Sequence, residues 1–263
     1  FTVADHYTKS DADTLLAAKA TNTAVALKAP IASPSFTGNV GIGTSSPAGK
    51  LHVKTSASGA TAVAGADDLV IEHADYGGMS ILSENEGHIY FGDNEDADVG
   101  RIEYQHGANA MVFRTNAADA MTIDGAGIVT KPKQPAFRAC KDTGDTSSTG
   151  YIVWNASKIN VGGHYSTSTG KFTAPVAGNY YFAVRALTAS ATQNNIWIGI
   201  NHNGNSVLQT YHSHINHSNI SGEAVITMAA NDYVQTYWGG TGMIHTGGTN
   251  HHIYSFFQGH LIG

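Results

Sequence analysis

The sequence predicts a mainly β protein with three parts: a short N-terminal coiled-coil helix, a β-rich trimeric shaft and a C-terminal β-sandwich or barrel. Helix-forming residues are concentrated before Pro30, and short apolar segments then alternate with turn residues as far as residue 130. Longer, more aromatic segments follow to the end of the chain. We therefore expect domains at residues 1–35, 36–130 and 131–263.

The N-terminal helix is predicted by composition and by capping. Residues 11–29 are rich in Ala, Leu and Lys, and Thr8 lies three residues before Asp11. Pro30 ends the helix because its ring clashes with the preceding turn. A 4-3-4 spacing predicts a coiled-coil seam of Leu16, Ala20, Thr23 and Leu27. So short a helix is marginal alone in water, so we expect it to pack against copies of itself, with a single surface helix as the alternative.

The shaft is predicted from short β segments separated by clusters of Gly, Asp, Asn and Ser. The segments centre near Val40, Val53, Val70, Ile81, Tyr90, Ile102, Val112, Ile123 and Val129. Few of their residues are aromatic, so a single copy has a thin core. Regular, thin β segments commonly bury their apolar side against copies of themselves, which predicts an intertwined shaft.

The C-terminal part shows longer strands and hairpin signals. A strand is expected at residues 178–185, and Asn203-Gly204 between two apolar runs is a strong hairpin signal. A second hairpin is expected from the runs at residues 224–228 and 233–238, and a last strand at 253–262. Many strands at this spacing indicate a sandwich or barrel.

Composition excludes several classes of protein. The formal net charge of −6 argues against a nucleic-acid-binding surface, and the single cysteine, Cys140, excludes an internal disulfide. No apolar run reaches the length of a membrane span. Because the chain starts at Phe1, we interpret it as a fragment or a processed product.

Residues 131–263 resemble the globular head of complement component 1q, a jelly roll related to the tumour necrosis factor fold. The resemblance rests on PAFRA at 135–139, NVGGHY at 160–165, TGKFTAPVAGNYYF at 169–182 and SFFQG at 255–259. It implies a trimer, with ligand or calcium binding near the apex.

The N-terminal half resembles bacteriophage tail-fibre proteins. The segments that carry this resemblance are YTKSDAD at 7–13, LKAPIASPSFTG at 27–38, VGIGTSSP at 40–47, KLHV at 50–53 and VGRIEYQH at 99–106. Together the two resemblances imply a trimeric fibre tip that ends in a globular head.

Histidines are the sharpest local feature of the head. On an extended strand His212 and His214 point the same way, because side chains alternate with period two. Around a threefold axis they would supply six nitrogens, which suits a transition metal such as iron or nickel; calcium on the axis is a further possibility. The alternative is a polar apical loop. The acidic turn at 93–98 does not fit an EF-hand and is expected to be a solvated turn.

Receptor contacts are expected in apical loops, because loops vary while strands hold them in place. The residues expected there are Tyr211, His212, His214, His217, Trp238, His245, His251 and His252. Burial is the alternative for Trp238. We expect Trp197, Tyr180, Tyr181, Phe182, Phe256 and Phe257 to form mainly the trimer core.

The function predicted from the sequence is that of a homotrimeric phage tail-fibre tip on the virion. It would attach to a host-surface glycan, or to a protein receptor, through the apical loops. Its partners would be two further copies and the receptor, without nucleic acid or membrane insertion. It would not be an enzyme, since no Gly-x-Ser-x-Gly or His-Glu-x-x-His motif is present. The alternatives are a bacterial secreted or surface adhesin with the same head, and a polysaccharide depolymerase.

Overall fold

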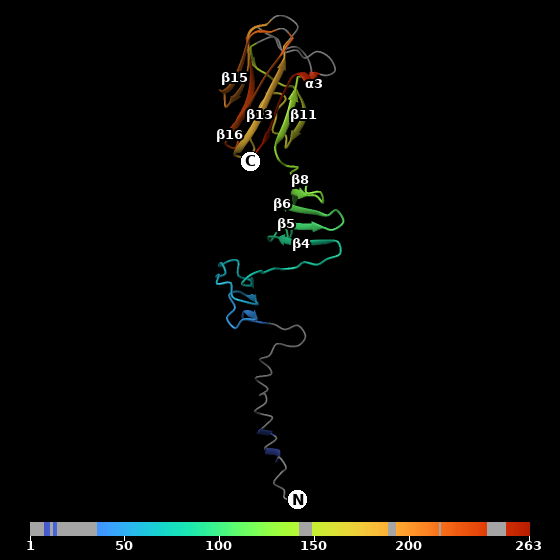
Figure 1. Ribbon diagram of the computed structural model, residues 1–263, viewed down its shortest axis with the longest axis vertical. Coiled ribbons are helices and arrows are strands. Elements are labelled where there is room, and N and C mark those ends of the chain that lie inside the picture. The colour runs from blue at the N-terminus through green and yellow to red at the C-terminus, as the bar shows by residue number, and fades with distance from the viewer. Residues whose placement is uncertain are drawn as a thin grey trace. The chain divides into compact units, whose positions relative to one another are not determined.

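The computed structural model shows a mainly β chain (Figure 1). The structure describes residues 8–10, 13–14, 36–141, 149–188, 193–215, 217–240 and 251–263. It divides into two compact units, Phe1–Ile81 and Leu82–Gly263. Among the described residues, no helix is both long enough and apolar enough to cross a membrane.

The predicted N-terminal coiled-coil helix is not seen in the described part of the chain. Of residues 11–29 the structure describes only Asp13 and Thr14, which are helical, as are Lys9 and Ser10 just before them. The seam residues Leu16, Ala20, Thr23 and Leu27 lie outside the described residues. The three-part domain division also stays a prediction.

The first unit contains a parallel sheet of three short strands, β1 (Val40–Ile42), β2 (Leu51–Lys54) and β3 (Leu69–Glu72). Val40 pairs with Leu51, and Leu51 pairs with Leu69, so side chains of equal parity form columns across the strands. Three predicted β segments are thereby confirmed. Ile81, in contrast, lies in none of the described strands, so the segment predicted there is wrong.

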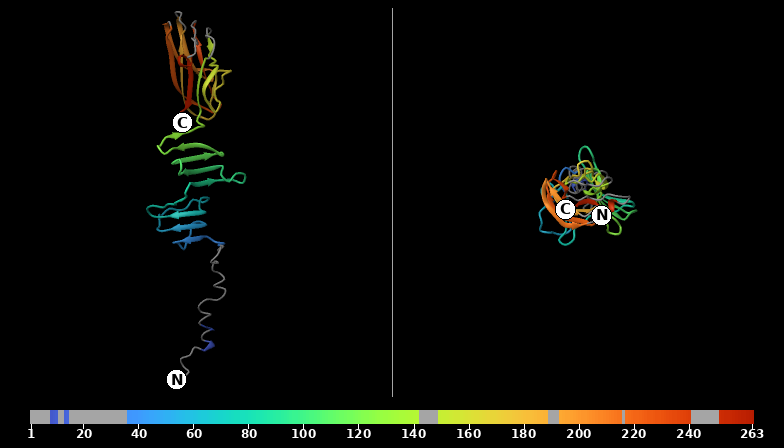
Figure 2. Two further views of the ribbon diagram at one scale, coloured as in Figure 1. Left: turned by 90° about the vertical axis from the view of Figure 1, so that its right-hand side faces the viewer. Right: turned by 90° about the horizontal axis from the view of Figure 1, so that it is seen from above.

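The second unit begins with an antiparallel meander of five strands, drawn side by side in Figure 2. The strands are β4 (Glu86–Phe91), β5 (Gly100–Gln105), β6 (Ala110–Thr115), β7 (Ala118–Ile123) and β8 (Val129–Thr130). A two-residue turn, Asn116-Ala117, joins β6 to β7, and both residues have positive φ. This is a hairpin geometry that glycine and asparagine adopt more readily than other residues.

The C-terminal part is a sandwich of two sheets around one core (Figure 1). One sheet has the order β11 (Ala156–Val161), β9 (Ala136–Cys140), β18 (Phe256–Leu261), β13 (Gly178–Leu187) and β16 (Asn219–Met228). The other has the order β10 (Gly150–Tyr151), β17 (Tyr233–Gly239), β14 (Gln193–His202) and β15 (Asn205–Ile215), with β12 (Phe172–Thr173) on β17. A one-turn helix, α3 (His251–Tyr254), precedes β18.

The core of the sandwich is aromatic and closed within one chain. Tyr180, Phe182 and Phe257 are completely buried, because alternate residues of β13 and β18 point between the two sheets. Trp154 is also buried, and its Nε1 donates to Thr236 Oγ1 at 2.8 Å. The assignment of Tyr180, Phe182 and Phe257 to a trimer core is therefore corrected: these residues form the core of the single chain.

The two hairpin predictions have different outcomes. Asn203 and Gly204 have φ values of 50° and 84° and join β14 to β15, which confirms the first hairpin. The second hairpin is wrong, because β16 pairs with β13 while β17 pairs with β14. The turn between β16 and β17 therefore crosses from one sheet to the other. Asp232 holds this turn to the first hairpin, since it accepts hydrogen bonds from Ala229 N at 2.8 Å and from Asn203 Nδ2 at 2.7 Å.

Candidate binding surface on the head

Four aromatic side chains form a continuous row across the outer face of the sheet β10-β17-β14-β15. We call Tyr151, Tyr237, Trp197 and Tyr211 the aromatic ladder. The ring centroids of Tyr151 and Tyr237 are 5.2 Å apart, those of Tyr237 and Trp197 are 4.8 Å apart and stacked, and those of Trp197 and Tyr211 are 5.9 Å apart. Tyr151 is 45% and Tyr211 64% exposed, so both ends of the ladder are open to solvent.

Glycines allow Trp197 to lie against the sheet. Trp197 pairs with Gly239 on the neighbouring strand, and a Cβ added there would lie 2.0 Å from the indole Cε2. A Cβ on Gly199 would lie 3.2 Å from the indole Cζ3. Any larger residue at position 239 would therefore displace the indole from its place beside Tyr237.

Polar groups border the ladder. Tyr211 Oη donates to Gln209 Oε1 at 2.8 Å, and Asn201 Nδ2 lies 3.5 Å from Tyr151 Oη. Asn201 is 8% exposed, and its Oδ1 has no hydrogen-bond partner among the described residues. The surface thus combines flat apolar rings with amide and hydroxyl groups, a composition typical of binding surfaces.

Sequence reasoning missed three of the four ladder residues. Trp197 was expected in the trimer core, and Tyr151 and Tyr237 were not singled out. The signal was present in the alternation of β14, where Ile196, Ile198 and Ile200 fill the core and the residues between them must point outward. Of the predicted receptor-contact residues, only Tyr211 belongs to the ladder.

The histidines predicted beside Tyr211 do not form one patch with it. His212 follows Tyr211 on β15 and therefore points to the opposite side of the strand, the side on which Leu208 packs against the core. His217 follows β15 with φ 47° and is exposed. The side chains of His214, His251 and His252, and the whole of His245, lie outside the described residues. The metal site at His212 and His214 thus stays a prediction.

Trp238 is not a surface residue. It lies on β17, and its side chain is 0% exposed. The side chain belongs to the same buried cluster as Val234 and Ile198. The prediction that it contacts a receptor is wrong, because the parity of β17 directs Trp238 inward and Tyr237 outward.

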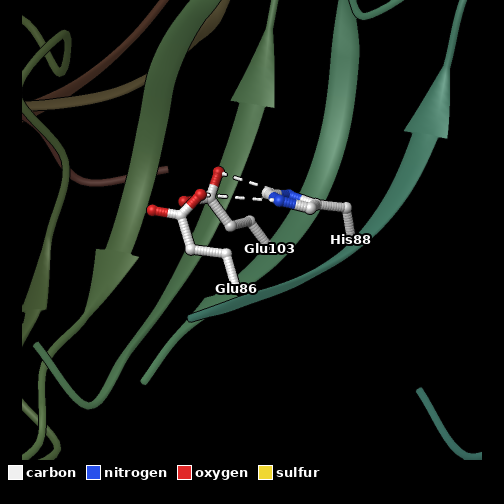
Figure 3. A group of neighbouring side chains, drawn as sticks. All are labelled: Glu86, His88 and Glu103. Atoms are coloured by element: carbon white, nitrogen blue, oxygen red, sulfur yellow. Dashed lines mark ion pairs between the residues drawn. The ribbon is translucent and has the colours of Figure 1, made fainter. Parts of the chain in front are cut away.

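One group of possible metal ligands lies on the meander (Figure 3). His88 Nε2 is 3.5 Å from Glu86 Oε2, and His88 Nδ1 is 3.8 Å from Glu103 Oε2. The two carboxylates thus face different ring nitrogens, whereas a metal ion takes one nitrogen of an imidazole. Glu103 is 1% exposed and its Oε2 is 2.5 Å from Arg101 Nε, so its charge is already compensated. The geometry favours a structural ion network between β4 and β5 over a metal centre.

The acidic segment at 93–98 forms a turn, as expected. Asp93 Oδ1 accepts hydrogen bonds from Asp96 N at 2.8 Å and from Glu95 N at 3.0 Å, and these bonds lower the pKa of the Asp93 carboxyl. Local backbone bonds thus account for this carboxylate.

The similarity of this chain to known proteins lies in the sandwich. A family model described as the C1q domain matches residues 136–262. Complement C1q tumor necrosis factor-related protein 3 of mouse is 28% identical over 131 residues, which are 49% of this chain and 51% of that protein. The mouse protein numbered 2 in the same series is 35% identical over 77 residues, 29% of this chain and 25% of that protein. The chain thus spans about half the length of the first relative it matches.

Among solved structures, the globular domain of zebrafish complement 1qA is 20% identical, with a TM-score of 0.39. The match covers 49% of this chain and 98% of that one.

These findings correct the predicted biology. The matched relatives are mammalian, and nothing in the comparisons indicates a bacteriophage tail fibre, so the predicted viral function and virion location are wrong. The bacterial adhesin is not favoured either. The short, repetitive segments of the N-terminal half did not define a family, whereas the longer motifs of the head did. The resemblance of the head is confirmed: residues 136–262 of this chain are a C1q domain.

Proposed function

We propose that this chain is an extracellular, self-associating binding protein whose C1q domain assembles as a homotrimer. The observation that carries the proposal is the C1q match over residues 136–262, which coincides with a sandwich that has its own closed aromatic core. C1q-domain proteins form trimers, and the mammalian relatives are named as C1q tumor necrosis factor-related proteins. The proposed role is binding and structural rather than enzymatic.

Light scattering after size exclusion tests the assembly. We expect a mass three times the 27.6 kDa of one chain, unchanged on dilution. A monomer mass would contradict the proposal. An antibody against the head should detect the protein outside the cells of its source, and exclusively intracellular staining would contradict the extracellular location.

Within this proposal the aromatic ladder is the contact surface for a protein partner, and Tyr211 is the more exposed of its two ends. Tyrosine and tryptophan supply large contact areas at protein interfaces. His217, which follows β15 and is exposed, is retained as a proposed peripheral contact. His212 points to the other side of the strand from Tyr211, so it is retained as a proposed contact separate from the ladder.

Saturable binding of the labelled protein to cells of its source tests this surface. Tyr211→Ala should abolish binding, and so should protease treatment of the cells. The matched control is Val176→Ala, which shortens a 48% exposed side chain away from the ladder. Equal binding by both variants would contradict a role for the ladder.

A further inference from the structure

The meander has one polar face and one apolar face, and the apolar face is the uncovered one. Its residues form two columns: Ile89, Ile102, Phe113 and Met121 in one, and Tyr104, Met111, Ile123 and Val129 in the other. None of the eight is buried; Ile89 is 40% exposed and Val129 is 50% exposed. Phe91, of the same parity as Ile89, is 56% exposed.

The opposite face of the meander is closed by its own polar side chains. Glu103 and Val112 on this face are 1% and 3% exposed. They lie among charged and polar side chains: His88 is 3.8 Å from Glu103 across β4 and β5, Arg101 pairs with Glu103 within β5, and Arg114 pairs with Asp98 in the loop before β5. Burial is therefore inverted at the centre of the sheet: Glu103 and Val112 on the charged face are covered, although Glu86 and Tyr90 on the edge strand are half exposed, while the apolar residues of the other face remain in contact with solvent. A sheet must bury its hydrophobic face against another layer, so this face calls for a partner.

The parallel sheet of the first unit repeats this inversion. Its aliphatic columns are Val40, Leu51 and Leu69, and Ile42, Val53 and Ile71. Ile42 is 56% exposed and Leu69 is 50% exposed. On the other face His52 is only 2% exposed, beside Glu72 and Lys54. Two separate sheets with the same feature argue for one common cause.

We propose that the apolar face of the meander packs against the same face of two other copies of this chain, around the threefold axis of the head, and that the parallel sheet of the first unit packs against its own copies in the same manner. The proposal rests on the self-association proposed above. Two observations point to copies of the chain as the occupant. The faces carry no charged residue, so like can pack against like without charge repulsion.

The second observation is the short link to the head. β8 ends at Thr130 and β9 begins at Ala136. The segment that connects the meander to the self-associating head can therefore span at most about 20 Å when fully extended. Trimerisation of the head therefore holds three meanders at high effective concentration. Three apolar faces directed at a common axis would leave the three charged faces in solvent.

Thiol cross-linking in the full chain tests this arrangement, because its one natural cysteine, Cys140, is buried. Ile102→Cys on the apolar face, treated with a short bis-maleimide, should yield covalently linked chains on a denaturing gel. Thr122→Cys lies on the opposite face of the same sheet, in the column of Glu103 and Val112, and should remain monomeric on the gel. Light scattering before the reaction gives the assembly state of both variants.

The outcomes separate the two proposals. A trimer in solution without an Ile102→Cys cross-link would overturn the shaft packing and leave the head trimer standing. Equal cross-linking of both variants would also overturn the shaft packing. If lipid or another protein covered the apolar face instead, the thiol of Ile102→Cys would stay unlinked, and this result would overturn the packing as well. A monomer would overturn the self-association itself.

A charge on the apolar face gives an independent measurement. Ile102→Glu should leave the trimer mass unchanged, since the head is untouched, but should open the meander to trypsin at Arg101 and Arg114. Faster cleavage at these two sites than in Thr122→Glu is expected. The same cleavage rate in both variants would argue against packing of the apolar face.

Discussion

At the scale of single residues, the core of the head depends on a glycine. Gly259 pairs with Phe182 across β18 and β13, and a Cβ added there would lie 2.5 Å from Phe182 Cδ1 and 2.8 Å from the carbonyl oxygen of Tyr181. Phe182 is completely buried between Phe137 and Phe257 and cannot move without disturbing both rings. Gly259→Ala should therefore destabilise the head by about 1–3 kcal/mol, the usual cost of overpacking. The test is urea unfolding followed by tryptophan fluorescence.

Gly263→Ala is the matched control for this substitution. Nothing lies within 4 Å of a Cβ at that position, so the midpoint of unfolding should not change. Equal midpoints for Gly259→Ala and the unmodified protein would show that the aromatic core is looser than the structure indicates.

At the scale of elements, the carboxylate of Glu72 links β3 of the parallel sheet to β2 and to the loop between these two strands. Glu72 Oε2 lies 2.9 Å from Lys54 Nζ and 3.1 Å from His52 Nε2, and its Oε1 accepts a hydrogen bond from Ser58 N at 2.7 Å. The bonds from Lys54 and Ser58 lower the pKa of Glu72 from its ordinary 4.5 to about 2. Because the folded pKa is lowered, the stabilisation is present above pH 4.5 and is lost as the pH falls towards 2.

Hydrogen exchange over residues 50–72 measures this effect. Glu72→Gln should exchange faster than the unmodified protein at pH 7, and the difference should close as the pH falls between about 4.5 and 2. Glu84→Gln, at an exposed acid, should match the unmodified protein at every pH. A difference between Glu72→Gln and the unmodified protein that does not depend on pH would contradict the role of this charge.

Elements also show what local sequence can predict. The Asn203-Gly204 hairpin was predictable, because both residues must adopt positive φ and few others do so readily. The strand that pairs with β17 was not predictable from local sequence. The turn at Asp232 has the residues of a hairpin turn whether the following strand pairs with β16 or crosses to the other sheet. The outward direction of Trp197 was encoded in the alternation of β14. The stacking of Trp197 on Tyr237 was not encoded locally, since it depends on the pairing of β14 with β17.

At the scale of the whole molecule, the head was identifiable because its motifs span a complete domain. The shaft was only partly predictable: its strands follow from local alternation, but the face that needs a partner becomes visible only in the strand register. Thin sheets of this kind bury little within one chain, so most of what stabilises them is not encoded locally.

Two compact units in one chain should unfold separately. All three tryptophans, Trp154, Trp197 and Trp238, lie in the second unit, and the large aromatic core lies wholly within residues 137–257. Tryptophan fluorescence therefore reports the second unit, while hydrogen exchange over residues 50–72 reports the first. Cooperative unfolding joins parts that share a core, and the aromatic core does not extend to the first unit.

At one protein concentration, Gly259→Ala should shift the fluorescence transition and leave the exchange of residues 50–72 unchanged at pH 7. Glu72→Gln should do the reverse. The double variant should show both effects, each of the size seen in the single variants, because distant and independent sites add. A single transition that both substitutions shift would instead mean that the two units fold as one, and that assembly through the axis couples them.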